Sequence, residues 1–344
     1  MIRVGIVGAG FMGRNHFNQY EKLSSRCKVV ALCDKEADRR VGDWSRVGGN
    51  VGDTQGTRRE LGDIRPCSDW RELVNATDID LIDICAPTFT HREIVVEALR
   101  AGKSVLCEKP MALSVAECDE MIEAAQGAKG QFMIAQVIRF WPEYVYLRKV
   151  VEDRSLGELR ALHLRRQASA PDYTLGNWIV NPELSGGAIL DLHVHDVDFA
   201  ISLFGKPRSV YAQGYQRQGG SVDRVHASWD YGEQRVVQIE GWWDAPPAFG
   251  FNMGFTAVFD TGHAIMWDMN SGKPLRVLRA GSKEAEEPTL PADDGYYREI
   301  EYFLSCVERG EAPVISTPQE SRDAVALALL EKQSVLTGER VHVA

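Results

Sequence analysis

The sequence predicts an α/β fold in which a doubly wound parallel sheet is followed by an α+β domain with a large, mostly antiparallel open sheet. Over residues 1–137, strand-like and helix-like segments alternate, as in a parallel sheet covered by helices on both faces. From 209 to 278, strand-like runs follow one another with Gly and Asp turns, which indicates antiparallel pairing. The 344 residues exceed the size of one core, about 250–300 residues, so we expect domains at 1–137 and 138–344.

The chain opens on an apolar strand, Ile2–Val7, that leads into a glycine turn with the spacing Gly8-x-Gly10-x-x-Gly13. In such a turn the first glycine permits the sharp bend, the second lets a pyrophosphate approach the backbone, and the third lets the next helix pack closely. That helix is expected over about 12–20. Its free N–H groups and positive dipole end suit a phosphate.

A second buried strand, Cys27–Cys33, ends at Asp34, which lies 21 residues after Gly13. A carboxylate here can accept hydrogen bonds from ribose hydroxyls and would repel a 2′-phosphate, which favours NAD over NADP. Lys35 is a neighbouring cation that would weaken this discrimination. A glycine triplet alone also fits a packing turn, but the order of strand, turn, helix, strand and acid predicts dinucleotide binding.

The rest of the first domain continues the alternation. An irregular stretch at 43–65 is expected to form a helix end and a loop. The pattern then predicts strands at 79–85, 104–107 and 131–136, a helix at about 90–100, and a helix that Ser114 caps together with Glu117. The second domain is expected to contain a strand at 157–168 and helices at 188–204, 294–309 and 318–336.

The tripeptide Glu108-Lys109-Pro110 follows the strand at 104–107. Ligands of open parallel sheets bind beyond the carboxyl ends of the strands. A lysine at this point could therefore contact a nicotinamide ribose and a reacting hydroxyl. From the tripeptide alone, a surface lysine before a turn proline is the favoured interpretation.

Gly186-Gly187 precedes a predicted helix that carries Asp191 and His195. The i, i+4 spacing directs both side chains to one face. A histidine with a pKa near 6.5 can act as a general base or acid around neutrality, and a carboxylate one turn back can orient it. A capping acid and a buried structural histidine would give the same pattern, and the helix alone does not decide between them.

The run Asp191-x-His193-x-His195 also has the composition of a metal site. On a helix, however, residue i+2 points away from i and i+4. A zinc ion needs three or four converging ligands, and nothing nearby in the sequence supplies another. We therefore expect no metal.

Two segments are candidates for binding substrate. One contains Arg139 and Trp141, and the other contains Asn177 and Trp178. An aromatic face with polar neighbours suits a sugar ring, which has apolar C–H faces and a rim of hydroxyls. The alternative is that both tryptophans are packing residues, because large aromatic side chains dominate cores.

Bulk properties exclude several classes of protein. The net charge of −10 argues against nucleic acid or an anionic membrane as the main partner. No run approaches the roughly 18–20 apolar residues of a membrane span, and the N-terminus does not resemble a signal peptide. Seven scattered cysteines without a Cys-x-x-Cys pair fit a reducing cytoplasm better than a disulfide framework.

Over nearly its whole length the chain resembles the Gfo/Idh/MocA oxidoreductases. The combination of Glu-Lys-Pro with the Gly-Gly, Asp and His pattern is specific to that family, whereas the glycine turn is not. One departure is His193, where a small or apolar residue is expected. The resemblance is carried by Gly8-x-Gly10-x-x-Gly13, Asp34, the segment from Ala86-Pro87 to His91, Glu108-Lys109-Pro110, and Gly186-Gly187-x-x-x-Asp191-x-x-x-His195.

The resemblance implies an N-terminal Rossmann domain, a C-terminal α+β domain, and a homodimer or homotetramer. It implies that Lys109 and His195 are the catalytic pair with Asp191 beside them, and that the bond between Lys109 and Pro110 is cis. The expected cofactor-binding residues are Gly8, Gly10, Phe11, Met12, Gly13, Asp34, Lys35, Pro87, Thr88, His91, Glu108 and Lys109.

We therefore expect a cytoplasmic NAD-dependent dehydrogenase that oxidises a ring hydroxyl of a sugar or cyclic polyol, such as an inositol, an aldose or a glycoside. One alternative is a glycosidase of the same superfamily that uses tightly bound NAD⁺ for a transient oxidation. Another is a non-catalytic dinucleotide-binding regulator. A regulator would be expected to lack the lysine–histidine pair, and this sequence contains both residues.

Overall fold

The computed structural model describes residues 1–50, 56–172, 174–216, 220–232 and 234–344. It divides into two compact units. The first consists of Met1–Val137, Asp172–Ile179 and Gly295–Arg322, and the second of Ile138–Pro171, Val180–Asp294 and Asp323–Ala344. The sequence-based boundary assigned 172–179 and 295–322 to the second domain, whereas here both segments belong to the first unit.

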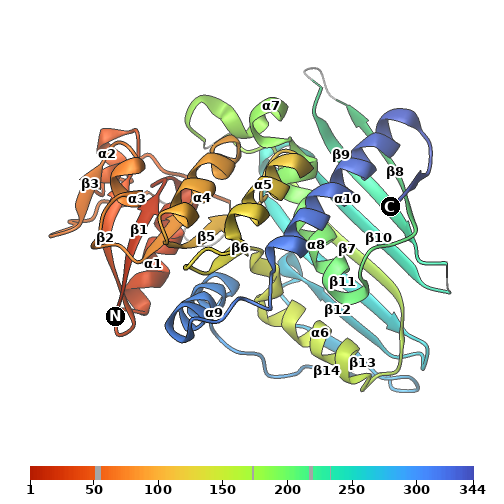
Figure 1. Ribbon diagram of the computed structural model, residues 1–344. Helices are drawn as coiled ribbons and strands as arrows, with labels where there is room; N and C mark the ends of the chain where they lie inside the picture. The colour runs from red at the N-terminus through yellow and green to blue at the C-terminus, as the bar shows by residue number, and fades with distance from the viewer. Residues whose placement is uncertain (51–55, 173, 217–219, 233) are drawn as a thin grey trace. The chain divides into compact units, whose positions relative to one another are not determined.

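The first unit contains a six-stranded parallel sheet in the order β3-β2-β1-β4-β5-β6 (Figure 1). This is the Rossmann order, and it reverses between β1 and β4. The strands are β1 (Ile2–Val7), β2 (Cys27–Cys33), β3 (Arg65–Cys67), β4 (Leu81–Ile84), β5 (Ser104–Glu108) and β6 (Phe132–Ala135). All were expected except β3, a three-residue edge strand whose sequence, Arg-Pro-Cys, has no apolar alternation.

Helices complete the first unit. Ser114 caps α5 as expected, because its Oγ accepts from the Glu117 amide at 3.3 Å and the Glu117 carboxylate accepts from the Ser114 amide. Late in the chain, α9 packs against α1. The helices are α1 (Phe11–Lys22), α2 (Ala37–Arg40), α3 (Arg71–Val74), α4 (His91–Arg100), α5 (Val115–Ala125) and α9 (Gly295–Arg309). The last helix, α10 (Pro318–Thr337), begins in this unit and continues into the second.

The second unit is built on a nine-stranded sheet in the order β14-β13-β12-β11-β7-β10-β9-β8-β15. Strands β7 and β10 pair in parallel and the other described neighbours pair antiparallel, so the sheet is mixed but mostly antiparallel, as expected. The strands are β7 (Leu159–Ser169), β8 (Ser209–Gln216), β9 (Val222–Asp230), β10 (Val236–Ala245), β11 (Phe251–Phe259), β12 (Ala264–Asp268), β13 (Arg276–Leu278), β14 (Ala285–Glu286) and β15 (Val341–His342).

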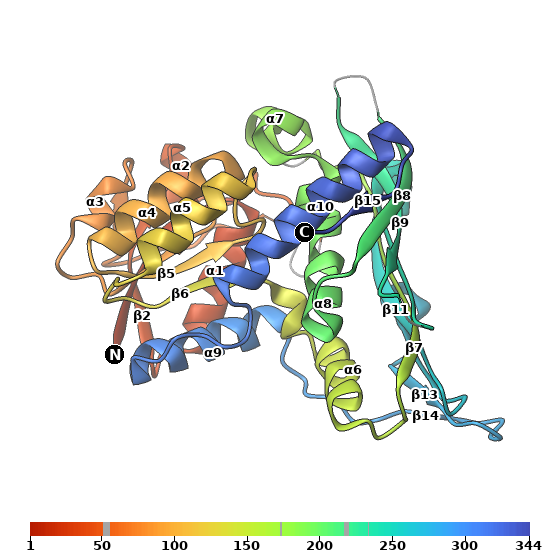
Figure 2. The same ribbon diagram turned by 45° about the vertical axis from the view of Figure 1, so that its right-hand side comes forward.

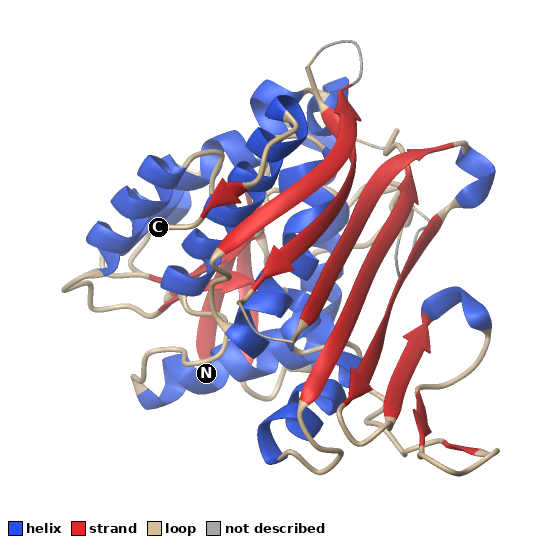
Figure 3. Cartoon of the chain, turned by 90° about the vertical axis from the view of Figure 1, so that its right-hand side faces the viewer, coloured by secondary structure: helices blue, strands red, loops and turns tan. Residues whose placement is uncertain are grey.

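Helices α6 (Pro142–Asp153) and α8 (Val194–Phe204) lie on one face of this sheet (Figure 2). The opposite face is turned toward the viewer in Figure 3. Tyr144 of α6 is fully buried and joins the layers, because its ring lies edge-on to Phe199 of α8 at 4.9 Å and to Phe255 of β11 at 5.1 Å. A further short helix, α7 (Pro182–Ser185), precedes the turn that leads into α8.

None of the helices in the described ranges combines the length and apolar character needed to cross a bilayer.

Candidate active site

Of the three glycines in the turn, Gly8 and Gly13 leave no room for a side chain, whereas Gly10 does. Gly8 has φ of +95°, and a Cβ there would lie 2.5 Å from the carbonyl oxygen of Cys85. A Cβ at Gly13 would lie 1.8 Å from the carbonyl oxygen of Gly8. A Cβ at Gly10 would contact, among the described atoms, only Arg39 Nη1 at 3.8 Å. The backbone is therefore open at Gly10, directly before α1, which has no side-chain cap. This geometry fits a pyrophosphate.

Asp34 is fixed at this turn by two backbone hydrogen bonds. Its Oδ2 accepts from the Ala9 amide at 2.7 Å and its Oδ1 accepts from the Glu36 amide at 2.8 Å. Arg40 donates to the carbonyl oxygens of Asp34 and of the exposed Lys35. An ionised carboxylate accepts about four hydrogen bonds, so the half-buried Asp34 retains acceptor capacity for ribose hydroxyls.

His91 connects the loops that follow β4 and β5. Its Nε2 lies 2.9 Å from the Ala86 carbonyl oxygen and its Nδ1 lies 3.0 Å from that of Pro110. Burial lowers the pKa of His91 despite these two acceptors. Pro87 and Thr88 lie between Ala86 and His91 in sequence, and the buried Thr88 begins a 3₁₀ turn. The ring therefore ties together two loops that contain expected cofactor-binding residues.

Lys109 follows β5, and its bond to Pro110 is cis as expected. Its backbone amide donates to Glu108 Oε2 at 3.1 Å. The Lys109 side chain is half-buried, whereas Glu108 is buried. The Glu108 carboxylate thus folds back onto the backbone of the lysine that follows it.

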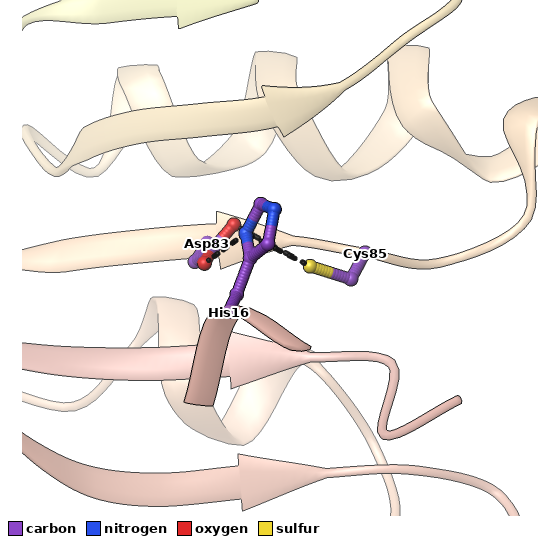
Figure 4. Close-up of side chains that lie close together, drawn as sticks. All are labelled: His16, Asp83 and Cys85. Atoms are coloured by element: carbon purple, nitrogen blue, oxygen red, sulfur yellow. Dashed lines mark hydrogen bonds and ion pairs between the residues drawn. The ribbon is translucent and has the colours of Figure 1, made fainter. Parts of the chain in front are cut away.

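The sequence patterns did not assign a role to His16 of α1, yet it lies at the centre of a buried cluster (Figure 4). Its Nδ1 lies 2.9 Å from Asp83 Oδ2 and 3.4 Å from Cys85 Sγ. Its Nε2 lies 3.1 Å from Glu108 Oε1 and 4.0 Å from Glu299 Oε1. We call these five residues the His16 cluster. Burial by itself lowers the pKa of His16, but Cys85 and Asp83 raise it well above its usual value.

By residue type, His16 with Asp83 and Cys85, or with Glu108 and Glu299, could hold a metal ion. His16 Nδ1 is hydrogen-bonded to Asp83 Oδ2 at 2.9 Å. Nε2 and Glu108 Oε1, 3.1 Å apart, lie at ion-pair distance without hydrogen-bond geometry. We therefore assign the cluster to one hydrogen bond and ion pairing around a charged imidazole. Among the described residues, the Asp191, His193 and His195 set contributes to neither grouping.

In the second unit, the predicted helix at 188–204 is correct from Val194 onward but wrong at its start. Ile189–His193 forms a π-helical turn, in which hydrogen bonds span five residues. The regular i, i+4 spacing of Asp191 and His195 therefore does not describe their relation. Asp191 is half-buried, and His195 retains 9% of its surface exposed.

His193, the departure from the family pattern, points into the core of the second unit. Its Nε2 lies 2.6 Å from Glu331 Oε2 of α10, and Trp229 donates to Glu331 Oε1 at 2.5 Å. A Cβ at Gly241 would lie 2.5 Å from His193 Nδ1, so the glycine makes room for the ring. His193 is fully buried and has a carboxylate partner, which explains how an imidazole fits at this position.

The four expected substrate residues have different environments. Arg139 is 2% exposed and forms a bidentate pair with Asp198, with Nε–Oδ2 at 2.6 Å and Nη2–Oδ1 at 2.8 Å. Trp141 is half-buried directly before α6. Asn177 is exposed with φ of +53°, and Trp178 is half-buried. Tyr173, in the loop expected to contain the last two, lies outside the described residues.

All seven cysteines are free thiols, as expected for a protein without a disulfide framework. Six are buried and Cys85 is half-buried. Burial raises the pKa of Cys27 to about 11 and the pKa values of Cys33 and Cys118 to about 12. These thiols are therefore protonated and unreactive at neutral pH.

Two family models match this chain. One, described as an oxidoreductase family with an NAD-binding Rossmann fold, matches residues 2–136, and the Gfo/Idh/MocA C-terminal domain matches residues 144–264. Trans-1,2-dihydrobenzene-1,2-diol dehydrogenase of Xenopus laevis is 34% identical over 259 residues, which cover 72% of this chain and 76% of that protein. Inositol 2-dehydrogenase 2 of Paenarthrobacter aurescens is 26% identical over 353 residues, covering 97% and 96%.

The fold is shared with a solved structure of levoglucosan dehydrogenase in complex with NADH and levoglucosan. That structure has a TM-score of 0.82 at 20% identity and covers 99% of both chains. The glycine turn, the Rossmann strand order and the mixed sheet thus agree with the family models in both halves of the chain. This chain accordingly belongs to the Gfo/Idh/MocA family of oxidoreductases, with an NAD-binding Rossmann unit and the C-terminal domain of that family.

Proposed function

We propose that the protein is an NAD-dependent dehydrogenase that oxidises a ring hydroxyl of a sugar or cyclic polyol. The observation that carries the proposal is Lys109 at the carboxyl end of β5, where its backbone amide donates to the Glu108 carboxylate. Ligands of this sheet type bind at that edge. Relatives named inositol dehydrogenases support the substrate class.

The residues of the first unit fit a dinucleotide. The open backbone at Gly10 and the N-terminus of α1 would bind the pyrophosphate, with Phe11, Met12 and Gly13 in the same turn. Asp34 would accept from the adenosine ribose, which favours NAD over NADP. Pro87, Thr88, His91 and Glu108 would line the nicotinamide end. When bound, the cofactor supplies the hydride acceptor.

His195 and Lys109 are proposed to act on one substrate oxygen. Neutral His195 accepts the proton of the hydroxyl as its carbon is oxidised. Lys109 donates a hydrogen bond to the same oxygen and stabilises its developing negative charge. Asp191 orients Lys109 or His195. These roles leave no step that requires a metal ion.

Substrate contacts are proposed for Trp178, Asn177 and Trp141, whose aromatic faces and amide suit a sugar ring. Arg139 is already paired with Asp198, so its contribution would be to orient the segment before α6. We also propose that the enzyme acts in the cytoplasm as a homodimer or homotetramer, and light scattering of the purified protein would test the oligomeric state.

The test is a panel of inositols, aldoses and glycosides, followed by NADH absorbance. His195→Ala and Lys109→Ala should each lower kcat at least about a hundredfold, with NAD⁺ binding retained by calorimetry. The exposed His342 and Lys129 give matched controls, because their alanine variants should keep full activity.

Release of a free sugar without net NADH would favour the NAD-dependent glycosidase instead. Near-normal kcat in both folded alanine variants would refute the proposed roles of the pair.

A further inference from the structure

We propose that His16 is a positioning residue that fixes Glu108 and, through the Glu108 carboxylate, the backbone of Lys109. The inference rests on the proposed function, because it takes Lys109 as the lysine that contacts the reacting oxygen. It adds a residue of α1 that acts on catalysis without touching cofactor or substrate.

The contacts form a continuous path. His16 Nε2 lies 3.1 Å from Glu108 Oε1, and the other carboxylate oxygen, Oε2, accepts from the Lys109 amide at 3.1 Å. Both oxygens of Glu108 are thus engaged, one by the ring and one by the next residue of the chain. Losing the ring contact would free the carboxylate to turn away from the Lys109 backbone.

The far side of the ring is anchored to the neighbouring strand. His16 Nδ1 lies 2.9 Å from Asp83 Oδ2, and neither side chain is exposed to solvent. His16 therefore connects α1, the helix that begins at the pyrophosphate turn, to the ends of β4 and β5. A displacement of about 1 Å at a catalytic group can cost a hundredfold in rate, so this connection matters for Lys109.

The groups that face the ring account for its charge. Asp83 and Cys85 approach from β4 and the residue that follows it, Glu108 from β5, and Glu299 from α9. Tyr296 of α9 lies 6.3 Å away between ring centroids, and burial raises the pKa of the nearby Tyr20. Burial also raises the pKa of the Cys85 thiol. The phenol is therefore neutral. The ring is faced by three carboxyl groups and by the sulfur of Cys85, 3.4 Å from Nδ1.

Asp83→Asn gives a test that keeps the shape of the cluster. Asp83→Asn removes one of the groups that raise the pKa of His16 against burial, so this pKa falls and the ring loses its proton at a lower pH. A neutral ring carries no charge to attract the Glu108 carboxylate. Glu108 should then be held less firmly and should move more readily.

The expected result is a new alkaline limb in the pH profile of kcat, that is, a decrease at high pH that wild type lacks. In Asp83→Asn, kcat should fall by about tenfold or more as pH rises from about 6 to about 9, whereas KM for NAD⁺ changes less than about threefold. His16→Gln should have a low kcat at every pH, and Asp83→Asn combined with His16→Gln should lack the limb. Glu308→Gln is the matched control for a charge change on α9, because Glu308 is half-exposed and pairs with Arg26.

A second readout does not depend on catalysis. Lysines in the cofactor-free protein are acylated and the products are quantified by mass spectrometry. Lys109 should react at least about threefold faster in His16→Gln than in wild type, because the segment that contains Lys109 is exposed to solvent more often. Labelling of the exposed Lys129 should not change. If Lys109→Ala keeps full activity while this labelling difference is present, the proposed function fails and the positioning contact stands.

Two outcomes would overturn the inference. One is a folded His16→Gln protein with kcat within about twofold of wild type and unchanged Lys109 labelling. The other is an Asp83→Asn profile that matches wild type at every pH. If His16→Gln fails to fold, the Asp83→Asn profile and Lys109 labelling in that variant decide the question alone.

Discussion

The two units bury charge in different ways. In the second unit each of two buried arginines has its own carboxylate, because Arg139 pairs with Asp198 and Arg166 pairs with Asp196 at 2.6 and 2.7 Å. In the first unit a single imidazolium, that of His16, faces three carboxyl groups. The arginine pairs are electrically balanced, whereas the histidine cluster is not.

This contrast separates the buried charges that shape the fold from those that can respond to solution conditions. A guanidinium stays protonated at every accessible pH, so a one-to-one pair with a carboxylate behaves as a fixed structural link. An imidazolium keeps its proton only because its neighbours favour the charged form. The pairs should therefore determine stability at all pH values, and the His16 cluster should make it depend on pH.

The largest expected effect comes from breaking a balanced pair. Arg139→Met leaves Asp198 as a buried charge without its guanidinium, which should lower the free energy of unfolding by about 3–5 kcal/mol. Arg139→Met combined with Asp198→Leu should recover most of that loss, because no charge remains buried. Urea denaturation at pH 7 measures both. If Arg139→Met alone lowers the free energy of unfolding by less than about 1 kcal/mol, solvent reaches the pair with Asp198.

His16→Gln should lower the free energy of unfolding by about 1–3 kcal/mol at pH 6, since it removes the hydrogen bond to the Asp83 carboxylate and the ion pair with Glu108. The pKa of His16 is raised in the folded protein, so its stabilisation is fully present below the unfolded value of about 6.5 and is lost as pH rises through the folded pKa. The difference from wild type should therefore shrink as the pH is raised from about 6.5 into the alkaline range. Urea denaturation across this range measures it, with Arg139→Met as the pH-independent control.

Asp34 offers a third arrangement, a half-buried carboxylate bonded to backbone amides. Asp34→Ala should narrow the preference for NAD⁺ over NADP⁺ by about tenfold, the effect of about 1.4 kcal/mol, because the repulsion of a 2′-phosphate disappears. Calorimetric dissociation constants for both cofactors test this. Tighter NADP⁺ binding by the unmodified protein would contradict the assignment of Asp34.

The smallest effect is expected at the ion pair between Arg26 and Glu308, whose side chains are 25% and 41% exposed. Glu308→Gln should change the free energy of unfolding by less than about 1 kcal/mol, because solvent screens such pairs. Thermal or urea unfolding gives the value. A loss as large as that of Arg139→Met would mean that burial does not explain the contrast between the two units.

Local patterns were sufficient for the glycine turn of the first unit and for the strands on either side of it. The strand Ile2–Val7, the glycine turn and Asp34 are close in sequence, and each position is restricted by backbone geometry that residue type reveals. The strand Arg65–Cys67 was missed because three residues at a sheet edge carry no periodic signal. The mixed second sheet was predicted as a class, but alternation does not identify which strands pair in parallel.

The parts of the candidate site that the sequence did not predict depend on contacts between residues that are distant in the chain. The π-helical turn at Ile189–His193 was read as a regular helix, since the sequence does not show that His193 pairs with Glu331, 138 residues away. His16 was visible as a histidine on a predicted helix, but its partners Asp83, Glu108 and Glu299 come from three other elements. Sequence spacing predicted candidate catalytic residues, but it did not predict the buried charges around them.

The cofactor unit is assembled from three separated stretches of chain, and the last of them contains α9 with Glu299. A gene shortened after codon 137 would encode the six parallel strands but not the helix that packs against α1. The same holds for a chimaera that exchanges only this leading part with a relative. To exchange the whole first unit between two relatives, recombination would have to replace residues 1–137, 172–179 and 295–322 together. A single crossover would instead combine the His16 of one parent with the Glu299 of the other.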